Sequence, residues 1–360
     1  MNHRVAIVGV GWAGFRPQTP DLSYKELMYE AAVRAYADAG VDPRKDIESF
    51  VTVAEDFHEG TSIFDEYVPD QLGAVLKPVQ TITGDGLHGL ATAYMLIRTG
   101  MFDIVALEGH SKASNVLTLD NINAHAQDPV LNRPLRLNTH FVAGMEMNRY
   151  LHDSMTSFEQ CAAVVVKNRK NALLNPLASY AEDLTLDSVL NGPPLAWPLG
   201  SRETARHVDG AVVMVLASQK AAEHLDGQPI WIEGMGWCND SPSLESREWG
   251  QIAYISQAAQ MAYRQAGIRS PWDEIDFAEV DDTYAYKELQ SLEALGVCKF
   301  GQAGELLEEG AFDPQGVFPV NVSGGSLGVG SLMDATGLMR AMEAVLQLRG
   351  EAGKHQLPFG

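Results

Sequence analysis

Short apolar runs alternate with amphipathic stretches along most of this chain, which is the pattern of an α/β protein. The apolar runs are continuous, as in strands that are buried on both faces of a sheet. They predict strands at Val5–Gly9, Ser49–Ala54, Val79–Thr83, Phe102–Gly109 and Asp209–Ser218. Period-3.6 stretches between them predict helices at Ser23–Ala39, Asp70–Leu76 and Leu87–Thr99.

The same order of a strand, a helix and a second strand occurs twice, at residues 4–50 and 229–277. The first copy begins VAIVGVGW and the second IWIEGMGW, and their helices end in AYADAG and AYRQAG. A repeat of this length indicates a duplicated β-α-β unit. We therefore predict two pseudo-symmetric halves, residues 1–225 and 226–360, with a site in the cleft between them.

The two halves differ in two places. Residues 111–205 form an excursion of loops and short helices that the second copy lacks. The second half ends with a predicted strand at Phe318–Val322, a glycine-rich loop and a helix, and nothing follows that matches the last two strands of the first half. Because soluble proteins avoid open sheet edges, we expect the native chain to continue past Gly360 by roughly thirty residues, or another chain to cover that edge.

Composition and charge narrow the class of protein. The chain has 360 residues, 46% of them hydrophobic, and a net charge of −21, which argues against a nucleic-acid partner. No apolar run is long enough to span a bilayer, and the N-terminus is not a signal peptide. Three cysteines indicate no disulfide framework and suggest a cytoplasmic protein. No Cys/His cluster has the spacing of a zinc site, so we expect no metal.

The amino-acid sequences of several segments resemble those of the thiolase superfamily, especially the sterol-carrier-protein-type and archaeal thiolases. The segments that carry the resemblance are VAIVGVG, AYADAGVDP, FDIVALEGHSKAS, DGAVVMVLAS and PVNVSGGSLGVG. The resemblance implies a thiolase fold, with two halves each built on a mixed five-stranded sheet and stacked as five α/β/α/β/α layers. It also implies a homodimer and a coenzyme A site built partly by residues 111–205.

The positions of the family's catalytic residues differ here. Asp85 stands in place of the nucleophilic cysteine, and Ser331 replaces the histidine that activates it. The family's second motif reads DDTY, with Asp281 at its polar position and Tyr284 at its aromatic one. A carboxylate cannot form a stable thioester, and a serine is no general base near neutral pH. Thiolase chemistry through a covalent acyl-enzyme is therefore not expected.

The residues at these positions allow alternatives. Asp85 and Asp334 occupy equivalent strand-turn-helix corners of the two halves, so each could be a helix N-cap. Asp85 and Asp281, if they share a pocket, could instead hold one proton as an acid/base pair, which suits a lyase or aldol-type step. His88 follows on the same helix as a further candidate, against a role as a core histidine. Tyr284 could donate a proton or simply pack under the sheet.

Binding residues are predicted in two places. Asn321, Gly324 and Gly325 lie in a loop that approaches the thioester in thiolases, so its N–H groups could stabilise an oxyanion. Basic residues in the excursion are candidates for contact with the coenzyme A phosphates, against an ordinary solvated helix face; they are Lys167, Arg169 and Arg202, with Lys170 and Arg206 nearby. His110 and Lys112 fall where thiolases place dimer-interface residues.

Two hypotheses about function remain open. The protein could make or break a carbon–carbon bond in an acyl-CoA, by acyl transfer or aldol-type chemistry, without a cysteine nucleophile. It could instead be a catalytically silent thiolase-like subunit. Relatives of this type often pair with a small OB-fold protein carrying a zinc ribbon, so such a companion, or an active thiolase paralogue, is an expected partner.

Overall fold

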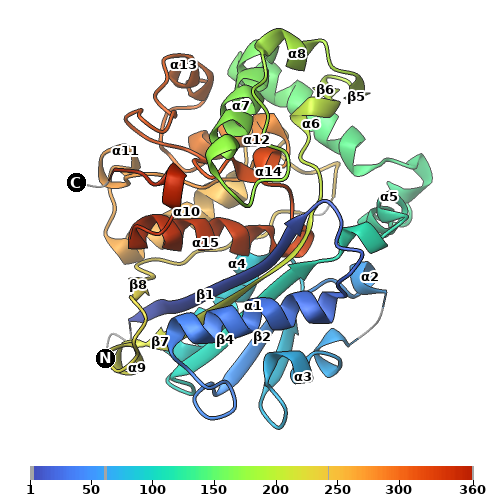
Figure 1. Ribbon diagram of the computed structural model, residues 1–360. Coiled ribbons are helices and arrows are strands. Elements are labelled where there is room, and N and C mark those ends of the chain that lie inside the picture. Colours follow the sequence, from blue (N-terminus) through green and yellow to red (C-terminus); the bar gives the residue numbers. More distant parts are fainter. Residues whose placement is uncertain (1–3, 61–62, 242, 359–360) are drawn as a thin grey trace. The chain divides into compact units, whose positions relative to one another are not determined.

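The computed structural model describes residues 4–60, 63–241 and 243–358 (Figure 1). Its contacts group the chain into two compact units. Unit 1 comprises residues 1–116, 207–233 and 332–360, and unit 2 comprises residues 117–206 and 234–331. This grouping cuts across the two predicted halves, because residues 229–233, which begin the second copy, and residues 332–360, which end the second half, lie in unit 1. None of the helices formed by the described residues has the length and apolar character needed to cross a bilayer.

Unit 1 is built on one six-stranded mixed sheet with the order β3-β2-β4-β7-β1-β8. The strands are β1 (Val5–Arg16), β2 (Ser49–Val53), β3 (Val79–Ile82), β4 (Ile104–Ser111), β7 (Asp209–Ser218) and β8 (Ile230–Trp231). β2 pairs in parallel with both β3 and β4, whereas β7 is antiparallel to β4 and to β1. The five strands predicted for the first half are confirmed, and β1 is longer than predicted.

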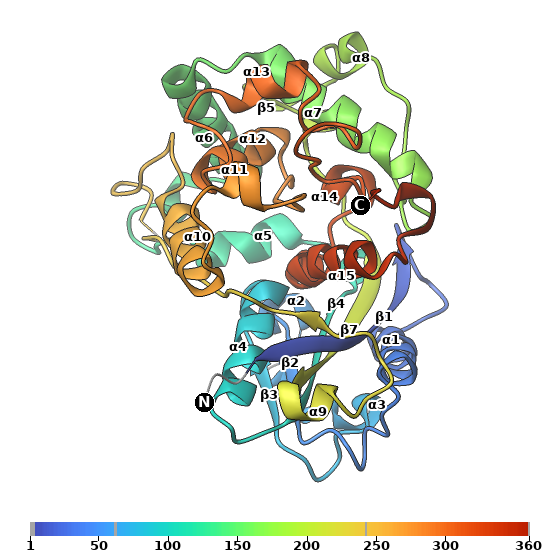
Figure 2. The same ribbon diagram turned by 90° about the vertical axis from the view of Figure 1, so that its left-hand side faces the viewer.

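Helices cover both faces of this sheet (Figure 2). The longer ones are α1 (Tyr24–Ala39) on one face, and α4 (Gly86–Arg98) with α15 (Thr336–Arg349) on the other. Shorter helices are α2 (Asp56–Glu59), α3 (Pro69–Leu72) and α9 (Gln219–Ala222), with 3₁₀ turns at η1 (Phe64–Glu66), η2 (Ala113–Asn115), η7 (Met333–Ala335) and η8 (Gly353–His355). α3 is shorter than predicted because Gly73 adopts a left-handed conformation with φ 73° and ends it.

The start of α1 follows directly from local sequence. Ser23 caps the helix through its side chain, and Glu26 returns a hydrogen bond to the Ser23 backbone N–H at 2.7 Å. This reciprocal capping box satisfies two N–H groups that the first turn leaves unpaired. Gly40, with φ 68°, ends the helix. The predicted helix is confirmed to within one residue.

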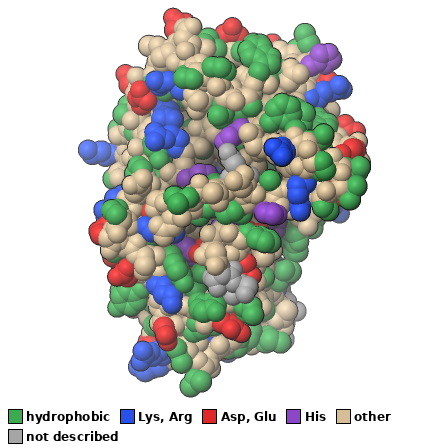
Figure 3. Space-filling model, turned by 90° about the vertical axis from the view of Figure 1, so that its right-hand side faces the viewer, with side chains coloured by type: hydrophobic (Ala, Val, Ile, Leu, Met, Phe, Trp, Pro, Cys, Tyr) green, Lys and Arg blue, Asp and Glu red, His purple; other side chains and the backbone are tan. Residues whose placement is uncertain are grey.

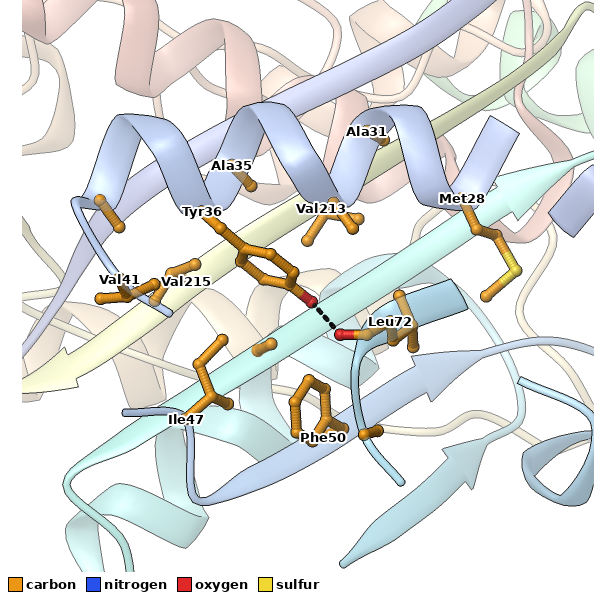
Figure 4. Packing of buried hydrophobic residues seen from close by; sticks show 14 of the residues in the cluster. Met28, Ala31, Ala35, Tyr36, Val41, Ile47, Phe50, Leu72, Val213 and Val215 are labelled. Carbon is orange, nitrogen blue, oxygen red and sulfur yellow. Dashed lines mark hydrogen bonds between the residues drawn. The ribbon is translucent and has the colours of Figure 1, made fainter. Parts of the chain in front are cut away.

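The core of unit 1 lies between α1 and the sheet (Figure 4). Tyr36 points from α1 toward the sheet, and its hydroxyl donates a hydrogen bond to the Leu72 carbonyl at 2.9 Å. Phe50 of β2 and Val213 of β7 are fully buried in the same cluster. Burying large apolar side chains of this kind contributes about 1.5–3 kcal/mol each.

Unit 2 is mainly helical. Its helices are α5 (Leu119–Asn123), α6 (Thr139–Ser154), α7 (Phe158–Asn171), α8 (Leu186–Leu190), α10 (Ala253–Ala266), α11 (Pro271–Glu274), α12 (Ala285–Ala294), α13 (Ala303–Glu308) and α14 (Gly325–Gly328). Short 3₁₀ turns are η3 (Ala124–Ala126), η4 (Arg133–Leu135), η5 (Ala172–Leu174) and η6 (Ser201–Glu203), and β5 (Pro194–Ala196) pairs with β6 (Leu199–Gly200). Its core gathers around the buried rings of Tyr150, Tyr286 and Phe318.

The predicted second five-stranded sheet is wrong for the described residues. β8 pairs with β1 of the first sheet, and the predicted strand at Phe318–Val322 makes only one isolated bridge, between Ala278 and Val320. The physical reason is visible in the first sheet, where β4 and β7 lie in the middle and hold the others together. This sequence contains no second copy of those two segments.

The duplication nevertheless appears in the packing of glycines under each helix. In the first copy, a Cβ at Gly11 would lie 2.2 Å from the Ala31 carbonyl oxygen of α1. In the second copy, a Cβ at Gly236 would lie 2.0 Å from the Ala258 carbonyl oxygen of α10. Each copy thus needs glycine because a helix backbone lies directly against it. Gly9 of β1 serves the same packing, since a Cβ there would lie 2.5 Å from the Ala35 carbonyl oxygen.

Candidate functional site

The first part of the candidate site is the corner where α4 begins in unit 1. Asp85 caps α4, and one of its carboxylate oxygens accepts a hydrogen bond from Leu87 N at 2.9 Å. The other oxygen accepts from Gly337 N, at the start of α15, also at 2.9 Å. His88 Nδ1 accepts from Asp85 N at 3.4 Å. The N-cap alternative for Asp85 is confirmed, while catalytic roles for Asp85 and His88 stay predictions.

Asp334 does not occupy an equivalent capping position, so that prediction is wrong. It lies in η7, and α15 begins after Ala335 without a side-chain cap. Its carboxylate instead accepts from Glu55 N at 3.0 Å and lies 3.1 Å from His58 Nδ1. Glu55 in turn accepts from Gly84 N at 2.9 Å, which connects this pair to the Asp85 corner. His58 had no partner at a recognisable spacing, and only the fold brings it to Asp334.

His110, in β4, and Lys112, just after it, are buried in unit 1, which corrects their placement at a dimer interface. The Lys112 ammonium lies 2.8 Å from Asp209 Oδ2 and also donates to the Thr19 backbone carbonyl. His110 lies between two carboxylates, with Nδ1 at 3.0 Å from Glu108 and Nε2 at 3.1 Å from Glu59. Burial lowers the pKa of His110, but both carboxylates offset it and raise the pKa to about 10.

The second part of the candidate site is the DDTY motif in unit 2. The Tyr284 hydroxyl oxygen and His140 Nδ1 lie 3.2 Å apart, and both side chains are partly exposed. Asp281 accepts hydrogen bonds from Thr283 Oγ1 at 2.7 Å and Thr283 N at 3.1 Å. The motif therefore contributes a tyrosine that contacts a histidine, and a carboxylate that contacts Thr283. His140 was not predicted, because it lies far from the motif in sequence.

The neighbouring tyrosines remain protonated. The ring of Tyr286 stacks on that of Tyr284 at 6.2 Å and is fully buried. Burial first, and then the nearby charge of Glu146, raises the pKa of Tyr286 well above its usual value. Burial, Glu146 and Asp281 likewise raise the pKa of Tyr254 to about 12. The site is therefore surrounded by neutral phenols that cannot act as bases near neutral pH.

The other aspartate of the motif, Asp282, is the centre of a buried hydrogen-bond network. It is fully buried and accepts from Ser326 N at 2.7 Å and from Asn168 Nδ2 at 2.9 Å. Asn168 also donates to Glu288 at 2.7 Å, and Asn321 Nδ2 donates to the same oxygen at 2.7 Å. This buried network ties α7, α12 and the loop before α14 together. Nothing in the local sequence distinguishes Asp282 from Asp281.

The N–H groups of the predicted oxyanion loop already donate hydrogen bonds within the loop, so that prediction is not supported. Asn321 is fully buried, and its side-chain oxygen accepts from Val280 N at 2.8 Å. Gly324 N donates to the Asn321 carbonyl and Gly325 N to Ser323 Oγ, each at 3.0 Å. The N–H groups are therefore already paired. The glycine at 325 is required because a Cβ there would lie 2.1 Å from Asp282 Oδ2.

Two of the three basic residues predicted to contact coenzyme A do not fit that role. Lys167 is buried, with its ammonium 3.1 Å from Glu288 and 2.8 Å from the Val320 carbonyl. Arg169 is buried and donates to the Tyr180 carbonyl at 2.9 Å. Arg202 is partly exposed, 3.5 Å from Glu182, and remains a candidate. On the face shown in Figure 3, Lys and Arg side chains are interspersed with hydrophobic and acidic ones.

Ser331, the predicted replacement of the catalytic base, and two of the cysteines are the remaining candidates. Ser331 is buried in unit 2, and its backbone N donates to the Arg206 carbonyl at 2.8 Å. Burial raises the pKa of Cys161 well above its usual value and, together with Glu293, raises the pKa of Cys298 to about 12. Both thiols therefore stay protonated and unreactive. Convergence of Asp85 with Asp281 and Ser331 stays a prediction, since Asp85 belongs to the other unit.

Comparisons of sequence identify related proteins. A family model described as thiolase C-terminal domain-like matches residues 238–359. Acetyl-CoA acetyltransferase of Methanothermobacter thermautotrophicus is 29% identical over 361 residues, covering 98% of this chain and 93% of that protein. Sterol carrier protein 2 of Bos taurus is 29% identical over 379 residues, covering 99% of this chain and 68% of that protein.

Solved structures agree in fold. A structure described as an Ltp2-ChsH2(DUF35) aldolase superposes with a TM-score of 0.83 and 27% identity, covering 99% of this chain and 92% of that one. Human mitochondrial 3-ketoacyl-CoA thiolase superposes with a TM-score of 0.76 at 17% identity, covering 98% and 93%, which shows the fold alone. The fold is that of the thiolases. Residues 238–359 match the thiolase C-terminal domain-like family, and the chain as a whole is similar to thiolases in sequence and fold.

Among the described residues, no group of three or more His, Cys, Asp or Glu side chains is arranged to hold a metal ion. The histidine–carboxylate pairs of unit 1 each contain too few ligands for the tetrahedral sites that zinc prefers.

Proposed function

We propose that this protein makes or breaks a carbon–carbon bond in an acyl-CoA thioester by aldol-type chemistry, without a cysteine nucleophile. The observation that carries the proposal is the contact of 3.2 Å between Tyr284 and His140 on the family's second motif. The raised pKa of the Cys161 and Cys298 thiols argues against acyl transfer through either of them. The relative described as an aldolase, at 27% identity over nearly the whole chain, supports the same class of reaction.

In the cleavage direction, the substrate would be a 3-hydroxyacyl-CoA. A base takes the proton of the 3-hydroxyl group, and the bond between C2 and C3 breaks. Its electron pair forms the enolate of the thioester, while C3 leaves as a carbonyl compound, and C2 then takes a proton. We assign the first proton transfer to Tyr284, whose own proton passes to His140. To Asp281, three positions before Tyr284 in the same motif, we assign the stabilisation of the imidazolium that results.

The test is turnover of 3-hydroxyacyl-CoA substrates, followed by mass spectrometry of the shortened acyl-CoA. Tyr284→Phe removes the hydroxyl and keeps the ring, so we expect the loss of general acid/base catalysis, about 10²–10⁴-fold in kcat. Tyr263→Phe is the matched control, because the Tyr263 hydroxyl only donates to the Leu295 carbonyl at 2.9 Å elsewhere in unit 2. Equal activity of the wild type and Tyr284→Phe would overturn the assignment of Tyr284.

The second candidate is a thiolase-like subunit without activity of its own. It is favoured by Asp85, whose two carboxylate oxygens each accept a backbone N–H, a structural use at the family's nucleophile position. The name Ltp2-ChsH2(DUF35) joins two components, which supports a companion protein, and an OB-fold zinc-ribbon protein or a thiolase paralogue is the partner class we propose. A homodimer is also proposed, by analogy with the superfamily.

Co-purification from the native source, with mass spectrometry of the bound proteins, separates these candidates. An active protein that purifies alone supports the enzyme. A stable complex with an intact thiolase, in which this chain turns over no 3-hydroxyacyl-CoA, supports the silent subunit.

A further inference from the structure

A cavity of about 140 Å³ lies within unit 1, apart from the DDTY motif. It is lined by side chains from the start of α1, from α2, from the end of β4 and the turn after it, and from η7, including Tyr24, Glu59, Asn115 and Asp334. One ordered water needs about 10–15 Å³ of such space, so the cavity has room for a small organic molecule. Neither the resemblance to thiolases nor the proposed reaction uses it.

The cations in the cavity wall are already paired. The Lys112 ammonium has three donors, and it contacts three oxygens: the Thr19 carbonyl, the Thr19 hydroxyl and Asp209 Oδ2. Each ring nitrogen of His110 lies within 3.1 Å of a carboxylate oxygen. An anionic ligand would therefore find no uncommitted charge on Lys112 or His110.

The carboxylates in the wall, by contrast, have acceptor capacity left. A carboxylate has about four acceptor positions. Among the described residues, Glu59 contacts only His110, through Oε1. Asp334 accepts from Glu55 N and contacts His58. Both side chains are largely buried, with 10% and 12% of their surface exposed, so charge on a ligand beside them would be weakly screened.

We propose that this cavity binds a small organic cation of the alkylammonium or guanidinium class through the carboxylates of Glu59 and Asp334. The donors of such a cation match the unused acceptor positions. A metal ion fits less well, because no group of three or more metal-ligating side chains occurs among the described residues. This site is independent of the proposed aldol-type reaction.

The same contacts connect the ligand to α2. The aromatic side chain of α2, Phe57, is exposed, so α2 is held to the unit mainly by polar contacts. These are the contacts of Glu59 with His110, of His58 with Asp334, and of Glu55 with Asp334 and Gly84. A cation that bridges Glu59 and Asp334 adds a further link between α2 and η7. Ligand binding should therefore slow amide hydrogen exchange in residues 55–60.

The experiment is calorimetric titration of the full chain with methylammonium and with guanidinium at low millimolar concentration, with acetate and inorganic phosphate as anionic probes. We expect saturable binding of one cation per chain and none of either anion. Glu59→Gln keeps the shape and removes the charge, so it should weaken binding by about tenfold or more. Glu66→Gln is the matched control, since Glu66 is exposed on η1, outside the cavity wall, and should bind as the wild type does.

A second variant keeps the proposal testable if Glu59→Gln is poorly folded. Asn115→Trp fills the cavity from its exposed side without changing either carboxylate, and it should abolish binding while preserving the melting temperature. Tighter binding of acetate or phosphate than of methylammonium would overturn the proposal. So would equal loss of binding in Glu59→Gln and Glu66→Gln, which would indicate only the general attraction of a chain with a net charge of −21.

Discussion

Asp85 and Gly337 lie 252 positions apart, and the Asp85 carboxylate accepts a hydrogen bond from Gly337 N at 2.9 Å. One side chain therefore caps α4 and also fixes the start of α15. A Cβ at Gly337 would lie 1.9 Å from Asp85 Oδ1, so only glycine permits this contact. Asp85 is thus a junction between two helices.

This junction predicts a measurable loss of stability. Asp85→Ala removes an N-cap, which costs about 0.5–2 kcal/mol, and leaves Gly337 N without its acceptor, which costs a further 1–3 kcal/mol. Asp85→Asn keeps one acceptor oxygen and should lose less. Urea unfolding of the two variants measures both effects. If Asp85→Asn abolishes turnover while its unfolding midpoint stays near that of the wild type, Asp85 acts in catalysis as well.

No covalent acyl-enzyme should form on this chain. Cys161 is fully buried, and burial raises the pKa of Cys298 to about 12, so neither presents a thiolate. Incubation with acetyl-CoA or acetoacetyl-CoA, followed by intact-mass measurement, should show the unmodified mass. A stoichiometric acetyl adduct on any of the three cysteines would contradict this reading of the site.

Glu293 predicts how stability changes with pH. Burial raises the pKa of Glu293 from 4.5 to about 7, although N–H groups of Ala303 and Gly301 and the Tyr150 hydroxyl act in the opposite direction. Between these values the folded chain holds a proton that the unfolded chain has released, so the free energy of unfolding falls as the pH rises from about 4.5 to about 7.

Glu293→Gln removes this titration and keeps an acceptor for Gly301 N. Between about pH 5 and pH 8 we expect the wild type to lose roughly 1–2 kcal/mol more stability than the variant, after allowance for partial exposure of the carboxyl. Urea midpoints at the two pH values give the comparison. Parallel losses in both proteins would show that Glu293 has an ordinary pKa.

The glycines that pack against α1 and α10 predict that alanine at either position lowers the stability of the protein by a similar amount. Gly11→Ala would place a Cβ 2.2 Å from the Ala31 carbonyl, and Gly236→Ala one 2.0 Å from the Ala258 carbonyl. Overpacking of this kind costs about 1–3 kcal/mol in each case. Gly100→Ala is the control, because nothing lies within 4 Å of its Cβ and only its φ of 75° opposes alanine. A Gly236→Ala variant as stable as the wild type would show that the second copy does not repeat the packing of the first.

The sequence by itself determined the strands and the long helices of the first half, the duplication and the thiolase fold. Those properties depend on local patterns, such as the capping box at Ser23 and Glu26, or on segments such as DGAVVMVLAS that stay recognisable in relatives. The N-cap at Asp85 was also predictable from the sequence, because an aspartate directly before a helix commonly accepts hydrogen bonds from the first N–H groups of that helix.

Only the tertiary structure decided which polar residues are buried and which partners they contact. Lys167 and Arg169 lie on α7 and look like solvated basic residues in sequence, yet both side chains face inward to partners on distant segments. The pairing of His58 with Asp334 joins residues 276 positions apart, and that of His140 with Tyr284 joins residues 144 apart. Hydrogen bonds and charges act over a few ångströms in space, so chain separation gives no sign of them until the fold has brought the groups together.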